Sequence, residues 1–319
     1  MKITNNFGMP EVYSHLVTQD LLDYESRRIT DRISFTVTTL ASPAYKYKLS
    51  RKYDADVEID VADQFLSFRG QMMHKALQDG DLCNALHEPR IGTYIGDVWV
   101  TGRPDIVLPG KIEDFKMKTV EAFWNPRETQ TDLARQLNPY RFIVFKVFGM
   151  PIDTLTGHMF LMNWVRRRAQ YEQGYPNKPH FEINVPVWSY ADTEAYLRER
   201  ITLFLLPLEE TPICTPEERW RHETVYSVKK EGNKKATKNF TSQEAAVAFR
   251  EWLEAKTKKG KPTTDKYNIE KKEGEDARCV GYCSPNHFCP YWIEHYSQVV
   301  EEPVFDAERN PLDTDEIEG

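Results

Sequence analysis

The chain has 319 residues, of which 40% are hydrophobic and 12% aromatic. This length suits one large domain or two smaller ones, and this composition is typical of a globular protein with ample material for a core. No run of about 18 apolar residues occurs, which excludes a membrane-spanning helix. The first residues lack the apolar stretch of a signal peptide, so we expect a cytoplasmic protein.

The formal net charge of −7 is unevenly distributed along the chain. Residues 301–319 carry eight acidic residues and one arginine, whereas residues 219–278 carry sixteen lysines and arginines against ten acidic residues. The overall acidity alone argues against a nucleic-acid binder. Blocks of like charge favour disorder, so we predict a disordered acidic tail at 301–319 and a basic segment on a near-neutral body.

The first predicted elements lie before residue 80. Residues 36–40 predict a short extended piece, and Ala44–Leu49 predicts a helix. Apolar residues recur at helical spacing over 62–78, which predicts a helix that ends at Gly80. The apolar face of that helix would consist of Phe65, Phe68, Met72, Met73, Ala76 and Leu77.

Short strands and two helices are predicted next. The strands would lie near 91–100, 102–108 and 111–118, with a tight turn at Pro109-Gly110, and then at 157–165 and 181–187. The helices would span 128–148 and 190–206. This order of elements predicts the α/β class, with a mixed sheet flanked by helices.

The basic segment predicts a small α+β unit. Residues 226–228 and 237–240 would form a hairpin around Glu231-Gly232-Asn233. Thr241 and Glu244 match a capping box that opens a helix running to about Ala255. Residues 256–262 predict a flexible basic linker.

Two acidic residues and a lysine lie on the hairpin predicted around Pro109-Gly110. Because strand residues two apart face the same side, Asp114 and Lys116 would project together, near Asp105 on the adjacent strand. Two-metal phosphodiester hydrolysis needs carboxylates that hold cations close to the phosphate, and a nearby lysine can orient water and neutralise charge. An Asp-x-Lys triplet alone more often reflects an ion pair on an exposed strand.

The surrounding motifs resemble the PD-(D/E)XK nuclease superfamily in its RecB-like branch. Gly102-Arg103-Pro104-Asp105 and Asp114-Phe115-Lys116 are similar to its central signature. Upstream, Gly70 and His74 are similar to its G-x-x-x-H helix, and downstream Gln136 and Tyr140 are similar to its Q-x-x-x-Y helix. Alone, His74 would more often be a partly buried histidine, and Gln136 and Tyr140 ordinary helix residues. The resemblance covers roughly residues 65–145.

The resemblance implies a restriction-endonuclease-like core and a role for each motif residue. His74, Asp105, Asp114 and the backbone carbonyl of Phe115 would bind Mg²⁺ or Mn²⁺, and Lys116 would assist the attacking water. Gln136 and Tyr140 would position the DNA strand or the strands that carry the motifs, although Pro139 would kink their helix. Glu88 stands where this branch often has an acidic residue.

The activity that the resemblance implies is hydrolysis of linear or single-stranded DNA by an exonuclease of phage type. The products would carry 5′-phosphates, and the process served would be recombination, replication or repair. The alternatives are a structure-specific endonuclease on the same centre and a non-catalytic DNA-binding module. Because the chain lacks a P-loop, unwinding would need a partner helicase, and a single-strand annealing or binding protein is a second expected partner.

Three of the five cysteines crowd together as Cys279, Cys283 and Cys289. In a chain without an export signal, such spacing favours a metal or iron–sulfur site over disulfides. The fourth ligand would be Cys214 or Cys83. The arrangement is similar to the [4Fe–4S] site of AddB-type and CRISPR-associated nucleases, and Cys214 would then close a loop around the basic segment. Zn²⁺ and free buried thiols are the alternatives.

Two groups of basic residues predict contacts with DNA phosphates. One is Arg166, Arg167 and Arg168, and the other is Lys229, Lys230, Lys234 and Lys235. Aromatic residues lie among the lysines, which suits single-strand binding, whereas a soluble lysine-rich hairpin is the alternative. We predict four parts: a nuclease core at 1–213, a basic inserted subdomain at 214–278, a cysteine segment at 279–300 and the acidic tail at 301–319.

Overall fold

The computed structural model describes residues 1–26, 32–78, 85–258, 261–262 and 265–297. The described residues fall into two compact units, which lie within Met1–Pro212 and Ile213–Glu302 and are called the first and second unit below. The four-part division made from the sequence stays a prediction. The predicted acidic tail, Gly80 and Cys83 lie outside the described residues. No described helix has the length and apolar character needed to cross a membrane.

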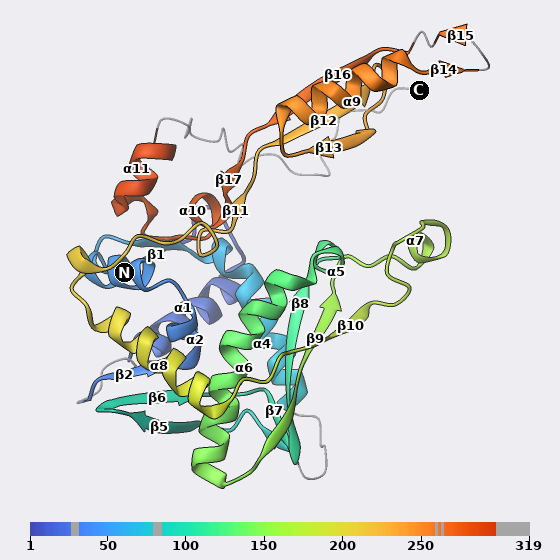
Figure 1. Ribbon diagram of the computed structural model, residues 1–319. Coiled ribbons are helices and arrows are strands. Elements are labelled where there is room, and N and C mark those ends of the chain that lie inside the picture. The colour runs from blue at the N-terminus through green and yellow to red at the C-terminus, as the bar shows by residue number, and fades with distance from the viewer. Residues whose placement is uncertain (27–31, 79–84, 259–260, 263–264, 298–319) are drawn as a thin grey trace. The chain divides into compact units, whose positions relative to one another are not determined.

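A five-stranded mixed sheet forms the centre of the first unit, with strand order β10-β9-β8-β7-β4 (Figure 1). Its strands are β4 (Leu86–His87), β7 (Ile106–Leu108), β8 (Gly110–Lys118), β9 (Ile152–Leu161) and β10 (His180–Asn184). β8 and β9 run parallel, whereas the other neighbours are antiparallel. The predicted α/β class is confirmed, and the restriction-endonuclease-like core stays a prediction.

A second sheet in the first unit has the order β2-β6-β5. Its strands are β2 (Ser34–Thr36), β5 (Ile91–Ile95) and β6 (Val98–Gly102). The single strand predicted over 91–100 is wrong, because Gly96 adopts a φ of +60° and turns the chain into a hairpin. The strand predicted over 102–108 begins only at Ile106.

The predicted extended piece at 36–40 is also wrong beyond its first residue. Helix α2 spans Val37–Ala41, although its sequence is rich in β-branched residues. The Thr36 side chain accepts a hydrogen bond from Thr39 N at 3.0 Å and so caps the helix. This local side-chain bond outweighs the β preference of the segment.

Helix α6 (Pro126–Phe148) packs against both sheets and confirms the long helix predicted there. Leu137, Ile143 and Val144 are fully buried, and the helix continues through Pro139. Gly157 on β9 leaves the space that the Leu133 side chain fills. Val147 is 45% exposed in the last turn of the helix.

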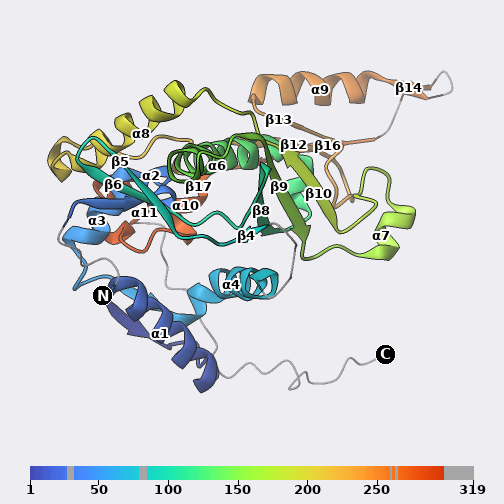
Figure 2. The same ribbon diagram turned by 90° about the horizontal axis from the view of Figure 1, so that it is seen from below.

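The remaining elements of the first unit surround these sheets. They are β1 (Lys2–Thr4), α1 (Glu11–Ser26), α3 (Ala44–Lys52), β3 (Glu58–Asp60), α4 (Phe65–Gln78), α5 (Glu121–Trp124), α7 (Arg166–Tyr171) and α8 (Tyr190–Leu205). Figure 2 shows α4 beside α1, where the Phe68 ring packs against Tyr13. The apolar face predicted for α4 is not buried, because Phe65 is 45% and Met72 50% exposed.

The second unit contains a three-stranded antiparallel sheet covered by one helix. The strands are β12 (Val225–Lys230), β13 (Lys238–Phe240) and β16 (Tyr267–Lys272), and the helix is α9 (Gln243–Ala255). The predicted hairpin and helix are confirmed, but β16 was not predicted. The cap of α9 is Ser242 rather than Thr241, since Ser242 Oγ accepts from Ala245 N at 3.3 Å.

Shorter elements complete the second unit. They are β11 (Arg221–His222), β14 (Thr257–Lys258), β15 (Lys261–Pro262), β17 (Glu275–Asp276), α10 (Ala277–Gly281) and α11 (Pro290–Tyr296). β14 pairs with β15 inside the segment predicted as a linker. The flexibility predicted for this segment stays a prediction.

Candidate active site

Three side chains from separate parts of the first unit form a group that could hold a metal ion. His74 comes from α4, Glu88 follows β4, and Asp105 precedes β7. His74 Nδ1 lies 3.4 Å from Asp105 Oδ1 and 3.5 Å from Glu88 Oε1. Burial, and then the charge of Lys116, lower the pKa of His74, which favours the neutral imidazole. One neutral imidazole and two carboxylates fit a divalent cation such as Mn²⁺ or Mg²⁺.

Glu88 belongs to this group although it was not among the predicted ligands. Its backbone φ is +44°, a left-handed conformation that costs a non-glycine residue about 1 kcal/mol or more. Its side chain is 6% exposed, and Arg103 Nε lies 3.3 Å from its Oε2. The only sequence signal for Glu88 was its position ahead of a predicted strand, where the RecB-like branch often has an acidic residue. A buried acid in strained backbone is typical of functional sites.

Asp114 and Lys116 project from the same face of β8, as the strand alternation predicted. Lys116 Nζ donates to Asp114 Oδ1 at 3.0 Å and lies 2.8 Å from Oδ2. The alternative of an ion pair on an exposed strand is wrong, because Asp114 is fully buried. Burial alone would lower the pKa of Lys116. The negative charges of Asp114 and Asp105 have the larger effect and raise this pKa above its usual value. A lysine that stays charged can neutralise charge and orient water.

A hydrogen bond joins the two parts of the signature. Asp105 Oδ2 accepts from the backbone N–H of Phe115 at 2.7 Å. Burial, and then the charge of Asp114, raise the pKa of Asp105 to about 7. Two buried carboxylates repel each other when both are ionised, and a bound cation offsets this repulsion. The acid pair therefore fits a cation site, and the ligand role of the Phe115 carbonyl stays a prediction.

Gln136 and Tyr140 lie one turn apart on α6 and support the signature. Gln136 Nε2 donates to Asp114 Oδ1 and to Tyr140 Oη, both at 3.3 Å. Burial raises the pKa of Tyr140 to about 12, so its phenol stays protonated. The Tyr140 ring packs against the backbone of Gly102. These contacts favour the second role implied for the two residues, which is to position the strands that carry the motifs.

The site opens into a cleft of about 1000 Å³ in the first unit. His74, Glu88, Asp105, Lys116 and Gln136 contribute to its lining. Four arginines that the sequence did not single out as DNA contacts also line it: Arg32, Arg51, Arg90 and Arg103. Guanidinium groups bind phosphates through paired donors, so the cleft suits a phosphodiester substrate.

The predicted DNA-binding arginines lie elsewhere in the first unit. Arg166, Arg167 and Arg168 are exposed on α7, in the excursion between β9 and β10 (Figure 1). Arg168 Nε pairs with Glu172 at 2.8 Å, and its guanidinium stacks over the Tyr175 ring. The lining of the cleft does not include these arginines. Their contact with DNA stays a prediction.

The predicted DNA-binding lysines fall into two classes in the second unit. On β12, Lys229 pairs with Glu270, and Lys230 pairs with Asp265 at 2.7 Å. Lys234 and Lys235 are exposed in the turn between β12 and β13. The acidic partners come from β16 and the residues before it, which the sequence did not predict to lie beside β12.

The four cysteines predicted as ligands gather in the second unit, namely Cys214, Cys279, Cys283 and Cys289. All are half-buried, and none forms a disulfide. Burial, and then the neighbouring Cys283, raise the pKa of the Cys279 thiol to about 12, with Cys214 and Cys289 also contributing. The predicted partner Cys214 is therefore a neighbour of the C-terminal three, and the ligand role of all four stays a prediction.

Comparisons with known proteins give distant likenesses only. No family model matches the chain, and no curated protein does. A protein designated SSO0001 is 14% identical, with a TM-score of 0.40 over 61% of this chain and 87% of that one. A phage-related exonuclease from Haemophilus somnus 129PT is 11% identical, with a TM-score of 0.26 over 50% of this chain and 69% of that one. At these values neither likeness assigns a fold or an activity.

Proposed function

We propose that the chain is a metal-dependent DNA nuclease of the PD-(D/E)XK type, in its RecB-like form. The observation that carries this proposal is the convergence of four motifs at one cleft. His74 from α4, Asp105 before β7, Asp114 and Lys116 from β8, and Gln136 from α6 lie within one network of short contacts. Each residue type has the chemistry that phosphodiester hydrolysis requires at that place.

His74, Glu88 and Asp105 would hold one divalent cation, and Asp105, Asp114 and the Phe115 carbonyl would hold a second. Bound cations supply stabilisation of the charge that develops on the attacking and leaving oxygens. Lys116 orients the attacking water and adds positive charge beside the phosphate. Gln136 holds the Asp114 carboxylate, and the arginines of the cleft bind the flanking phosphates.

The finer proposal is an exonuclease that acts on linear or single-stranded DNA and leaves 5′-phosphates. Phage recombination, replication or repair is the process that such an enzyme would serve. Arg166–Arg168 and the lysines of the second unit would bind DNA outside the cleft. A helicase or a single-strand annealing protein would supply the substrate strand.

The test compares DNA hydrolysis by the full chain and by Asp114→Asn, with Mg²⁺ or Mn²⁺ present. Linear and covalently closed circular DNA are offered separately, with 5′- or 3′-labelled ends. We expect the full chain to degrade linear DNA and Asp114→Asn to lose at least about 100-fold in rate. The matched control is Asp153→Asn, an exposed acidic residue on β9, which should keep full activity.

Three results would contradict parts of this proposal. Equal rates for the full chain and Asp114→Asn would remove the catalytic role of the acid pair. Cutting of the closed circles would replace the exonuclease by an endonuclease on the same centre. DNA binding without hydrolysis in either metal would support the non-catalytic module instead.

For the cysteines of the second unit we propose a [4Fe–4S] cluster held by Cys214, Cys279, Cys283 and Cys289. The support for one shared site is that Cys283, Cys214 and Cys289 all lie close enough to raise the pKa of the Cys279 thiol. Anaerobically purified protein should be brown, and Cys214→Ser should lose iron and colour while Cys83→Ser keeps both. Colourless protein with one equivalent of zinc would contradict the cluster.

A further inference from the structure

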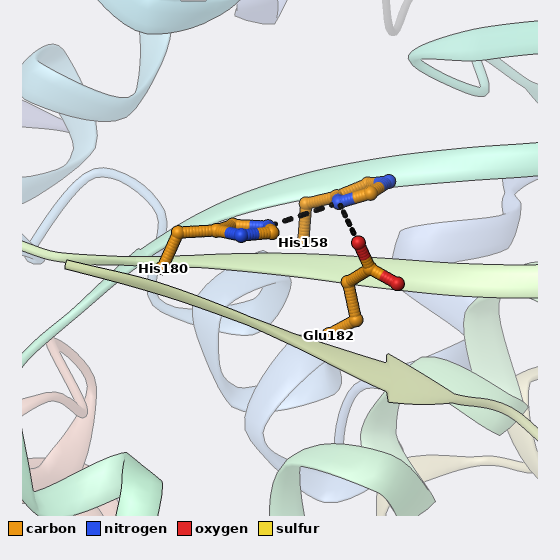
Figure 3. A group of neighbouring side chains, drawn as sticks. All are labelled: His158, His180 and Glu182. Atoms are coloured by element: carbon orange, nitrogen blue, oxygen red, sulfur yellow. Dashed lines mark hydrogen bonds and ion pairs between the residues drawn. The ribbon is translucent and has the colours of Figure 1, made fainter. Parts of the chain in front are cut away.

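A second group of metal-ligating side chains lies on β9 and β10 of the first unit, away from the candidate active site. It consists of His158, His180 and Glu182, whose ligand atoms all lie within 4.8 Å of one another. His158 Nδ1 is 3.1 Å from His180 Nε2 and 3.9 Å from Glu182 Oε1. Figure 3 shows the two rings and the carboxylate turned toward one another.

The pairing of the strands explains why these residues meet. His158 stands directly opposite Glu182 in the antiparallel pair of β9 and β10, and His180 is two residues from Glu182. Residues opposite each other or two apart share one face of a sheet. The spacing of the ring nitrogens is close to the roughly 3.3 Å that two imidazoles adopt on tetrahedral zinc, whose Zn–N bonds are about 2.0–2.1 Å.

The group lies on the opposite face of the sheet from Asp114 and Lys116. In the parallel pair of β8 and β9, Phe115 is opposite His158, whereas Asp114 is opposite Gly157. Because successive residues of a strand face opposite sides, the candidate active site and this group are separated by the sheet itself. They are therefore independent sites.

The second nitrogen of His158 faces a carboxylate, as metal-bound histidines commonly do. His158 Nε2 is buried and makes no hydrogen bond among the described residues, and it lies 3.4 Å from Glu113 Oε1. Glu113 in turn pairs with Lys111 at 2.5 Å. When a cation binds Nδ1, the ring proton of His158 is on Nε2. The Nε2–H group can then donate a hydrogen bond to the Glu113 carboxylate.

Two aromatic rings pack against the histidines of the group. The Phe115 ring stacks on His158 with centroids 4.8 Å apart, and the Phe160 ring lies 5.1 Å from His180. An apolar surround strengthens a charged ligand bond because it lowers the local dielectric. The open side is at Glu182, whose side chain is 55% exposed and gives an ion a path of entry.

We propose that His158, His180 and Glu182 form a zinc-binding site in which Glu113 orients His158. Two imidazoles and one carboxylate match the ligand preference of Zn²⁺, whereas Mg²⁺ prefers oxygen ligands alone. A water molecule completes the tetrahedron. The ion ties the edge strand β10 to β9 at the base of the excursion that carries α7.

The test measures zinc binding by metal-free full chain with a competing chromogenic chelator, in excess Mg²⁺ that occupies the carboxylates of the cleft. We expect the full chain to bind one equivalent more than His180→Gln and Glu182→Gln. Glu113→Gln should keep the stoichiometry and lose roughly 10–100-fold in affinity. His15→Gln, which changes an exposed histidine on α1, is the matched control and should bind as the full chain does.

Two readouts keep the result separate from the proposed nuclease and from misfolding. Zinc should raise the melting temperature of the full chain and of His15→Gln, and it should raise the melting temperature of Glu182→Gln by a smaller amount. The Glu182 side chain is 55% exposed, so we expect Glu182→Gln to fold. Equal zinc stoichiometry and affinity in the full chain, His180→Gln and Glu182→Gln would overturn the site. Mg²⁺-dependent DNA hydrolysis should be unchanged in Glu182→Gln, whichever way the zinc result falls.

Discussion

The ring of Tyr140 in α6 packs directly against the backbone of Gly102 at the end of β6. A Cβ atom built on Gly102 would lie 2.7 Å from ring carbons Cδ1 and Cε1 of Tyr140, closer than real Cβ atoms approach a neighbour. Tyr140 shares the Gln136 amide with Asp114. A chain of contacts therefore runs from Gly102 through Tyr140 and Gln136 to the Asp114 carboxylate, and it requires that residue 102 has no side chain.

Gly102→Ala should therefore lower both stability and activity. The added methyl group pushes the buried Tyr140 ring away, and overpacking of this kind costs about 1–3 kcal/mol of unfolding free energy. Displacement of Gln136 should lower the DNA hydrolysis rate as well. Urea unfolding and the rate on linear DNA measure the two effects.

Gly70→Ala is the matched control for this substitution, because Gly70 belongs to another motif but has open space around its Cβ position. It lies inside α4, where alanine is favoured over glycine by about 0.5–1 kcal/mol. We expect Gly70→Ala to be neutral or stabilising. Similar losses in both variants would contradict the steric explanation for Gly102.

Metal binding at the cleft should stabilise the folded chain and depend on Glu88. A ligand that binds only the folded state adds about 2.7 kcal/mol to the unfolding free energy when its free concentration is 100 times its Kd. We expect Mn²⁺ to raise the melting temperature of the full chain and of Asp153→Asn, and to raise that of Glu88→Gln much less. A full Mn²⁺ response in Glu88→Gln would exclude this residue from the ligand set.

The lysines of the second unit should differ in their effect on DNA binding. Lys229 and Lys230 are paired with acidic residues, whereas Lys234 and Lys235 are exposed in the turn. Replacing Lys234 and Lys235 by alanine should weaken single-strand binding and lower the salt slope by roughly 0.7 per lost phosphate contact. The double change at Lys229 and Lys230 should do less. Binding isotherms for single-stranded DNA at several salt concentrations measure both effects. A larger loss of affinity in the Lys229 and Lys230 variant than in the Lys234 and Lys235 variant would contradict the prediction.

Asp276 in the second unit should make the protein sensitive to acid. Its fully buried carboxylate accepts hydrogen bonds from Tyr291 at 2.9 Å, Tyr296 at 2.8 Å and Arg219 at 3.2 Å. Burial alone would raise the pKa of Asp276, but Tyr296, Tyr291 and Arg219 hold it below its usual value. Because the folded pKa is lower than the unfolded one, this stability is present above about pH 4 and is lost as the pH falls through the folded pKa.

Asp276→Asn should accordingly cost of the order of 3 kcal/mol near pH 7, since it leaves Arg219 without its charged partner. The difference from the unchanged chain should narrow as the pH is lowered from 6 to 3, which thermal unfolding followed by circular dichroism can measure. Asp265→Asn changes the partner of Lys230, whose side chain is 38% exposed, so it should cost less than Asp276→Asn at pH 7. A pH-independent cost for Asp276→Asn would contradict the ionic explanation.

Local periodicity was enough to predict part of the candidate site. The alternation of a strand placed Asp114 and Lys116 on one face, and the i, i+4 spacing of a helix placed Gln136 beside Tyr140. The helices α4, α6 and α8 were also predicted to within a few residues, because each carries a long apolar period.

Features that depend on the register between distant strands could not be predicted in this way. Glu88 meets His74 only because β4 pairs with β7, and His158 meets Glu182 only in the observed register of β9 and β10. The same limit applies to α4. Its apolar period predicted a buried face, but several of these residues, Met72 among them, remain exposed.

Strand β8 carries alternate residues into two chemically different environments. Asp114 and Lys116 lie on the face of the candidate active site, whereas Glu113 and Phe115 contact His158 on the opposite face. A shift of one residue along the strand would exchange these sets completely. Single-residue insertions and deletions inside β8 should thus be tolerated far less well than substitutions, and engineering of either face must keep the length of this strand fixed.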